Sequence, residues 1–137
     1  LAMFLPVVAG MGGNGGIQTL TVTTRGIALG EIQFSTGLRT VTKEMAVGLC
    51  LGACVGVLCA GLAILWSGNP YLGLVLFVSL VATLTFAGLL GAAVPLALEA
   101  LNLDPALGSG VIVTTITDAF GFATFLGSAT LLLDHLI

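Results

Sequence analysis

One acidic residue lies alone in a long apolar segment near the C-terminus of the chain. Asp118 is the only charged residue between Pro105 and Leu133, and it lies near the middle of that segment. A charged side chain at the centre of a membrane costs at least about 2.5 kcal/mol on insertion scales, so it faces a polar cavity, a cation or a partner, or it is protonated. No Lys or Arg lies in any apolar segment of the chain. The sequence therefore favours an external cation or a proton at Asp118, and a protonated carboxyl group bonded to a neighbouring helix is the structural alternative.

Small and hydroxyl-bearing residues follow the helical face of Asp118. The 3–4 spacing of a helix puts on that face Gly110, Val111, Thr114, Asp118, Gly121 and Phe125, flanked by Thr115 and Thr117. The two glycines would leave room for a channel beside the carboxylate, and the threonine hydroxyls would line water. The alternative is that these hydroxyls bond to carbonyls of the preceding turn, as threonines in membrane helices do.

A glycine-rich segment near the N-terminus is the second feature. Five of the nine residues from Gly10 to Gln18 are glycine, although each glycine weakens a helix by about 1 kcal/mol. Glycines let another helix, or an ion with its waters, approach the backbone. Asn14 and Gln18 are four residues apart, so their amides share a face. A dimer contact between small residues is the alternative, and it is compatible with a pore on a symmetry axis.

The candidate ligands of a cation in these two segments are all oxygen atoms. Hard oxygen ligands favour Mg²⁺ or Ca²⁺ over softer metals, and Mg²⁺ gives up its water reluctantly. One carboxylate per chain suits a hydrated Mg²⁺ held through its waters. A symmetric dimer would place two Asp118 carboxylates around one axis.

The other polar residues carry weaker signals. We expect Asp134 and His135 to be ordinary interfacial residues, with a cation-attracting mouth as the alternative. The acidic residues expected mostly to be solvated or to cap helices are Glu31, Glu44, Glu99 and Asp104; Glu31 is also a candidate for the inner mouth. The single histidine lies far from Asp118, so no Ser/His/Asp or Cys/His set exists and we expect no enzymatic activity.

The composition predicts an integral membrane protein built of helices. The chain has 137 residues, of which 58% are hydrophobic and only 7% charged, with a mean hydropathy of +1.22 and a net charge of −3. Soluble domains carry about a quarter charged residues, and three basic residues cannot build a nucleic-acid-binding face. No charged residue occurs from Met45 to Leu98, whereas a barrel would need short alternating segments. The expected fold class is all-α, a polytopic membrane helix bundle.

Four membrane segments are expected, each long enough to cross about 30 Å of hydrocarbon. Their predicted ranges are 1–24, 45–66, 71–98 and 105–133. A turn from Trp66 to Tyr71 separates the second from the third, which is expected to end near Pro95. Asp104 followed by Pro105 predicts a capped start for the fourth. Residues 30–44 are expected to form a short interfacial helix.

The distribution of basic residues predicts the orientation. Arg25, Arg39 and Lys43 all lie between the first two segments, so the positive-inside rule places the loop 25–44 in the cytoplasm. The C-terminus then lies outside, in a multi-pass protein of the plasma (inner) membrane. Within the second segment, the glycines at 48, 52 and 56 lie on one face and predict close helix packing. The three cysteines in the same segment are expected to be small packing residues.

Two motifs in this chain resemble the MgtE family of magnesium channels. Residues 6–18, PVVAGMGGNGGIQ, followed by 25–31, RGIALGE, are similar to the second transmembrane helix of that family. Residues 104–110, DPALGSG, and 114–121, TTITDAFG, resemble its last helix. The order and spacing of both motifs match, and the resemblance covers essentially the whole chain.

The resemblance implies a homodimeric channel in the lipid bilayer that conducts Mg²⁺, with other divalent cations as further candidates, through a pore lined by these two helices. It assigns the selectivity aspartate to Asp118 and an assisting backbone carbonyl to Thr114. The other residues expected to line the pore are Gly10, Gly13, Asn14, Gln18, Gly110, Thr117 and Gly121. The pore domain of the family has five membrane helices, preceded by soluble regulatory domains. We therefore expect that its first membrane helix and those domains are absent from this 137-residue segment.

Two other functions are left open by the residues. A secondary transporter would couple cation movement to protonation of Asp118. A purely structural membrane subunit would use its glycine faces for assembly alone.

Overall fold

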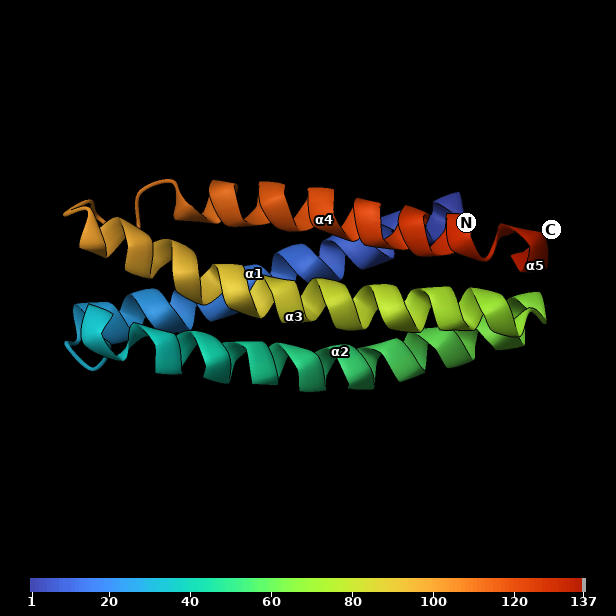
Figure 1. The fold of residues 1–137 in the computed structure, drawn as a ribbon, viewed down its shortest axis with the longest axis horizontal. Coiled ribbons are helices and arrows are strands. Elements are labelled where there is room, and N and C mark those ends of the chain that lie inside the picture. The colour runs from blue at the N-terminus through green and yellow to red at the C-terminus, as the bar shows by residue number, and fades with distance from the viewer. Residues whose placement is uncertain (137) are drawn as a thin grey trace.

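The computed structural model describes residues 1–136, and over this range the chain is helical with short connections (Figure 1). The elements are η1 (Ala2–Phe4), α1 (Leu5–Ala28), η2 (Phe34–Thr36), α2 (Gly37–Ser67), α3 (Pro70–Ala100), α4 (Ser109–Leu131) and α5 (Leu133–Leu136). The predicted all-α bundle is confirmed.

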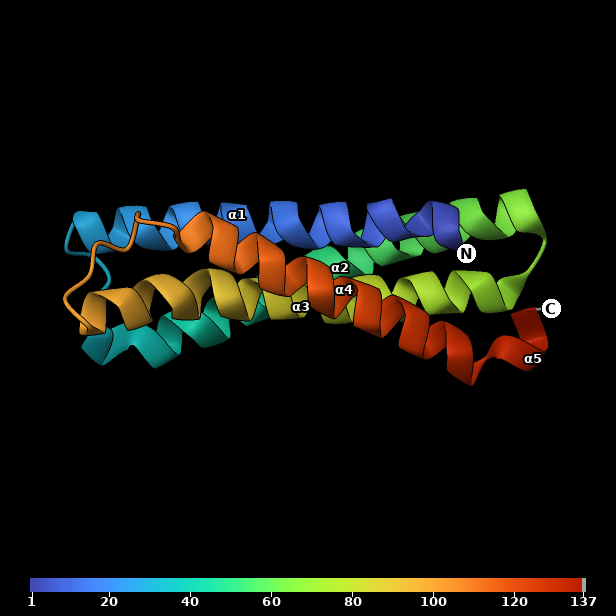
Figure 2. The ribbon, with the colours of Figure 1, turned by 90° about the horizontal axis from the view of Figure 1, so that it is seen from above.

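The central helix of the bundle is α3. It packs against α1, α2 and α4, whereas α1 and α2 barely touch each other. Figures 1 and 2 show the four long helices running along one axis, with α1 and α3 in one direction and α2 and α4 in the other. The N-terminus and the C-terminal helix α5 lie at the same end. This arrangement places α1 beside α4 on one flank of α3 and leaves α2 on the other.

Three helices among the described residues are long and apolar enough to cross a membrane, judged by length and composition. They are Phe34–Ser67, Pro70–Ala100 and Ser109–Leu131. Helix α1 has 24 residues, which is a sufficient length, but its glycines and threonines make it less apolar than the other three. A crossing by α1 therefore stays a prediction.

The glycines of α2 lie at its closest contact with α3, which confirms the packing predicted for them. A methyl group at Gly52 would lie 2.8 Å from the Cα of Val81, and one at Gly56 would lie 3.0 Å from the Cδ2 of Phe77. A methyl group at Gly48 would clash with the backbone carbonyl of Leu84. The two backbones thus approach to a distance that any side chain would prevent.

Two predicted helix boundaries are wrong. Helix α2 begins at Gly37, so residues 37–44 are its first turns, and the only separate helix within 30–44 is the three-residue η2. Helix α4 begins at Ser109 rather than at residue 105, because Gly108 has a φ of 70° and interrupts the helix. Asp104 accepts a hydrogen bond of 2.9 Å from the backbone N–H of Ala106, so it closes a turn and does not cap α4.

The end predicted for the third segment near Pro95 is also wrong, since α3 continues through this proline to Ala100. Proline lacks an N–H, so the carbonyl four residues earlier, at Gly91, loses its helical partner. The turn between α2 and α3 is confirmed. Gly68 has a φ of 70°, and Pro70 starts α3 after Asn69, whose side chain accepts a 2.9 Å bond from the N–H of Tyr71.

Candidate cation site

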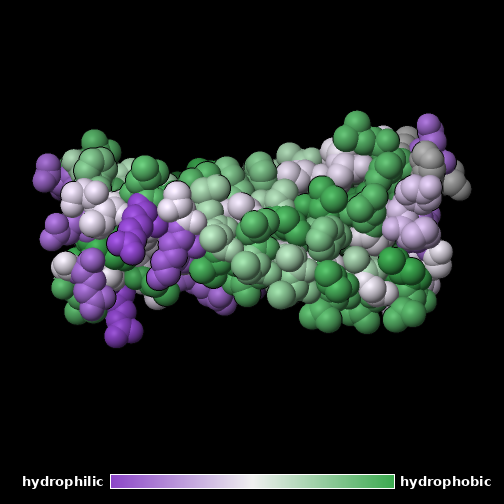
Figure 3. Space-filling model, turned by 60° about the horizontal axis from the view of Figure 1, so that its bottom comes forward, coloured by the Kyte–Doolittle hydropathy of each residue, from purple (hydrophilic) through white to green (hydrophobic). Residues whose placement is uncertain are grey.

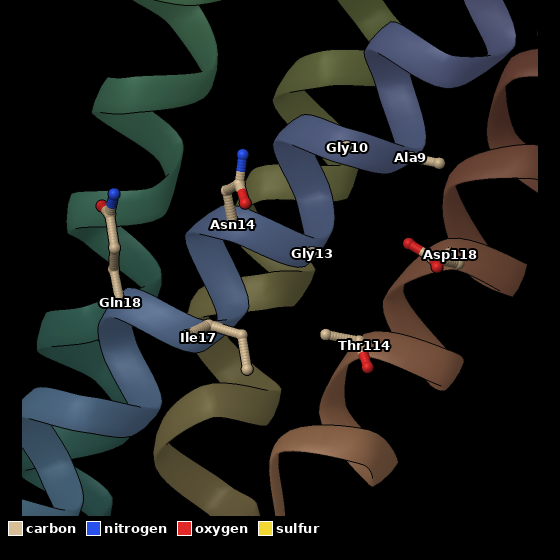
Figure 4. A pocket seen from close by; sticks show the side chains of 8 residues that line it. All are labelled: Ala9, Gly10, Gly13, Asn14, Ile17, Gln18, Thr114 and Asp118. Carbon is tan, nitrogen blue, oxygen red and sulfur yellow. The ribbon is translucent and has the colours of Figure 1, made fainter.

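A hollow of about 380 Å³ lies between α1 and α4 (Figure 4). Asp118 and Thr114 of α4 form one wall, and residues of α1 form the other. The α1 residues that line it are Ala9, Gly10, Gly13, Asn14, Ile17 and Gln18. The hollow thus gathers six of the nine predicted site residues, from segments about a hundred positions apart in the sequence.

The glycines of α1 create the space in front of the carboxylate. A methyl group at Gly13 would lie 3.5 Å from Oδ1 of Asp118, and one at Gly10 would meet nothing within 4 Å. Figure 4 shows Asp118 extending from α4 toward this bare stretch of α1. A hollow remains because neither glycine has a side chain to fill it.

The carboxylate of Asp118 is half-buried and unpaired. Within residues 1–136 it forms no hydrogen bond and no ion pair. No group of three His, Cys, Asp or Glu side chains that could hold a metal ion occurs in the described part of the chain. One chain therefore supplies a single carboxylate with free oxygens. This is too few ligands to coordinate a cation that has lost its waters.

The threonines of α4 bond to their own helix. The hydroxyl of Thr114 donates to the carbonyl of Gly110 at 2.9 Å. The hydroxyl of Thr117 donates to the carbonyl of Val113 at 2.9 Å. It also lies 3.0 Å from the backbone carbonyl oxygen of Thr114. The structural alternative for these hydroxyls is thus confirmed, and the oxygen that Thr114 adds to the hollow remains a prediction.

Three predicted pore residues lie outside this hollow. Gly110 borders a neighbouring hollow with Thr24, Arg25 and Ser109. Thr117 and Gly121 are buried inside the bundle. A methyl group at Gly121 would lie 3.4 Å from Cγ2 of Thr83, so this glycine serves the packing of α4 on α3.

The predicted face of α4 combines two adjacent columns of residues. The column that packs into the bundle is Ser109, Val113, Thr117, Gly121, Phe125 and Ala129. Thr114 and Asp118 each follow a member of that column by one position and face α1 instead. Val111, which was expected on the same face, is exposed. Spacing alone could not separate the columns, because the buried one also contains a threonine and a glycine.

The glycines of α1 also divide into two sets. Gly12, Gly15 and Gly16 pack against other helices of the same chain. A methyl group at Gly12 would lie 2.5 Å from Cγ2 of Thr83, and one at Gly16 would lie 2.7 Å from Cγ1 of Val113. These three glycines therefore make contacts inside the chain, whereas Gly10 and Gly13 border the hollow.

Two further expectations concern the ends of the bundle. Asp134 is exposed in α5, and the side chain of His135 lies outside the described residues. At the opposite end, Glu31 borders a hollow with Arg25 and Lys43. Neither placement tests whether these residues lie at the outer or the inner mouth of a pore.

Sequence reasoning missed the burial of two carboxyl groups, those of Glu44 and Glu99. Oε2 of Glu99 is buried and has no hydrogen-bond partner among the described residues. Glu44 was expected to be solvated or capping, but it exposes only 8% of its surface. The expectation is wrong because α2 extends through this residue and holds it against α3, where a methyl group at Gly88 would clash with the carbonyl of Glu44. The available signal was its position as the last charged residue before the apolar stretch 45–98.

A family model described as the MgtE divalent cation transporter matches residues 5–128. The chain belongs to this family. It is 38% identical over 136 residues to the magnesium transporter MgtE of Bacillus subtilis, covering 99% of this chain and 30% of that protein. It is 41% identical over 134 residues to magnesium transporter MgtE of Thermus thermophilus, covering 98% and 30%.

A third relative, magnesium transporter MgtE of Enterococcus faecalis, is 29% identical over 137 residues. The chain spans about 30% of the length of these curated relatives. The resemblance found in the two motifs is thereby confirmed at the level of the family.

Proposed function

We propose that this chain forms the membrane pore of a magnesium channel in which Asp118 binds hydrated Mg²⁺. The observation that carries the proposal is the unpaired, half-buried Asp118 carboxylate that faces a glycine-walled hollow. Membership of a divalent cation transporter family agrees with it. The name of the relatives, magnesium transporter, agrees with it as well.

The size and chemistry of the hollow suit a hydrated cation. Six waters at about 30 Å³ each occupy roughly 180 Å³, and the hollow has about 380 Å³. Mg²⁺ keeps several waters in most protein sites. Asp118 and Asn14 would then hold the ion through its waters, with the Thr114 carbonyl assisting.

A second copy of the chain would complete the pore. One carboxylate neutralises half the charge of Mg²⁺, whereas a two-fold axis beside α1 and α4 brings two carboxylates to one ion. Because Gly10 and Asn14 are exposed on this flank, polar groups here would otherwise face lipid, which is costly. The proposed partners are a second copy, the lipid bilayer and Mg²⁺.

The proposed membrane orientation follows the charges. Figure 3 shows hydrophilic side chains concentrated toward the ends of the bundle, with an apolar band between them. Arg25, Arg39 and Lys43 lie at the end where α1 ends and α2 begins. We place this end in the cytoplasm and the C-terminus outside, in the plasma membrane.

The experiment that tests channel function is Mg²⁺ entry into liposomes containing the purified protein, with and without an imposed pH gradient. A channel conducts down the Mg²⁺ gradient, so the entry rate is expected to follow the membrane potential and to be unchanged by the pH gradient. Entry that is driven by the pH gradient and saturates with Mg²⁺ would contradict the proposal and favour transport coupled to protonation of Asp118.

A further inference from the structure

A second carboxylate lies in a hollow of its own, on the other side of α1 from Asp118. Glu44 of α2 is 8% exposed and borders a hollow of about 160 Å³ between α1, α2 and α3. The polar side chains that border it with Glu44 are those of Gln18 and Thr19. The mechanism proposed for Asp118 does not use this hollow.

The burial of Glu44 follows from the packing of α2 on α3. Gly88 of α3 lies against the backbone of Glu44, and Gly48 one turn later lies against the backbone of Leu84. No side chain separates the two helices at this level, so Glu44 is held against α3 beside the hollow that α1 also borders. The position is imposed by the backbone and does not depend on a contact of the carboxylate itself.

The carboxylate of Glu44 has no partner in the described part of the chain, where it forms neither a hydrogen bond nor an ion pair. The neighbouring Lys43 is exposed. The oxygens of Glu44 are not among the fully buried unpartnered atoms of the described residues, so they open onto the hollow. A charge with so little access to water is costly without a partner. The hollow beside it supplies the room in which a counter-charge would lower that cost.

Gln18 connects the two hollows. It borders both the hollow of Asp118 and that of Glu44, and Figure 4 shows its side chain pointing away from Asp118 toward α2. Its amide thus lies on the Glu44 side, and its predicted place in the pore lining stays a prediction. Gln18 follows Gly13, which faces Asp118, by five residues, or roughly 7.5 Å of helix rise.

We propose that Glu44, the amide oxygen of Gln18 and the hydroxyl of Thr19 bind a second divalent cation between Asp118 and the basic end of the bundle. These ligands are hard oxygens of the kind that Mg²⁺ and Mn²⁺ accept. The 160 Å³ of the hollow corresponds to about five waters at roughly 30 Å³ each, enough for a partly hydrated ion. The inference rests on the proposed cation conduction, and conduction through several weak sites lets ions both enter and leave.

The test is to count Mn²⁺ ions bound per chain by equilibrium dialysis, with the purified protein in the Asp118→Asn background. Adding Glu44→Gln is expected to remove one bound Mn²⁺ per chain, because glutamine keeps the shape and loses the charge. The matched control, Glu31→Gln, changes an exposed carboxylate and is expected to leave the count unchanged. Gln18→Leu is expected to weaken the same site while retaining Glu44.

The outcomes separate this inference from the proposed function. An unchanged Mn²⁺ count in a folded Glu44→Gln protein, verified by gel filtration, would overturn the second site. If Glu44→Gln fails to fold, an unchanged Mn²⁺ affinity in Gln18→Leu would overturn it. Loss of the Glu44 ion with full Mg²⁺ entry in Asp118→Asn would uphold the second site and contradict the role proposed for Asp118.

Discussion

At the scale of single residues, Asp118 is available to a ligand because of what its neighbours lack. Thr117, one position earlier, is turned into the bundle, whereas Asp118 faces α1 at Gly13, where there is no side chain to pair with it or cover it. Such an unpaired carboxylate in an apolar bundle is costly. A bound cation lowers that cost, which is why we place the ion here.

Filling the hollow from the α1 side tests this arrangement. Gly13→Leu is expected to lower Mg²⁺ entry into liposomes at least tenfold, or about 1.4 kcal/mol. A methyl group at this position already lies 3.5 Å from the carboxylate, so a leucine would occupy the place of the hydrated ion. Gly61→Leu, at a glycine with nothing within 4 Å, is the control. Equal rates in the two variants would show that the hollow is not on the ion path.

At the scale of elements, the stability of the bundle depends on how closely α2 and α3 approach. The glycines at 48, 52 and 56 of α2 face backbone or ring atoms of α3. In lipid, such close packing of small residues drives helix association. The same contact buries Glu44, so the site proposed there depends on it.

Alanine substitutions at two glycines of α2 are expected to have opposite effects. Gly52→Ala would place a methyl group 2.8 Å from the Cα of Val81, and overpacking of this kind costs about 1–3 kcal/mol. Gly61→Ala meets no neighbour and is expected to stabilise the helix by up to about 1 kcal/mol. Unfolding in detergent, followed by circular dichroism, measures both. A Gly52→Ala protein as stable as the Gly61→Ala protein would refute the contact.

Much of the fold was predictable because its signals are local. The apolar runs, the turn at Gly68 and Pro70, and the glycine face of α2 each depend on residues close together in sequence. The limits of α2 and α4 were not predictable in this way. Gly37 begins a helix among polar residues, and Gly108 in the left-handed region delays a helix that Asp104 and Pro105 favour.

The candidate site, like the fold, was predictable only where its signals are local in the sequence. Asp118 and the glycines of α1 stand out because charge and glycine are unusual in apolar segments. The packing role of Thr117 and Gly121 and the burial of Glu44 follow from how α1, α2 and α4 lie on α3. These are contacts between distant segments, so no local sequence pattern predicts them.

At the scale of the whole molecule, the flank formed by α1 and α4 is the proposed meeting surface of two copies. Asn14 is exposed on it, and α2 lies on the other flank of α3 (Figure 1). A pore on the two-fold axis would turn Asn14 away from lipid and toward the partner copy. The apolar outer face of α2 would then remain in contact with the membrane.

This arrangement predicts which positions cross-link between copies. In a background with Cys50, Cys54 and Cys59 replaced by alanine, Asn14→Cys is expected to form dimers with a short bifunctional thiol reagent in membranes. Leu58→Cys, on the exposed face of α2, is expected to remain monomeric on denaturing gels. Cross-linking at Leu58→Cys but not at Asn14→Cys would place the dimer interface on α2 and contradict the arrangement proposed here.

The most direct test of the central claim is the rate of Mg²⁺ entry into liposomes for Asp118→Asn against Asp134→Asn. Both variants replace one aspartate by its neutral isostere, but Asp134 is exposed in α5, outside the hollow. We predict that Asp118→Asn lowers Mg²⁺ entry or its selectivity at least tenfold, or about 1.4 kcal/mol, and that Asp134→Asn conducts like the unmodified protein. Equal Mg²⁺ entry in the two variants would contradict the assignment of Asp118 as the ion-binding residue of the pore.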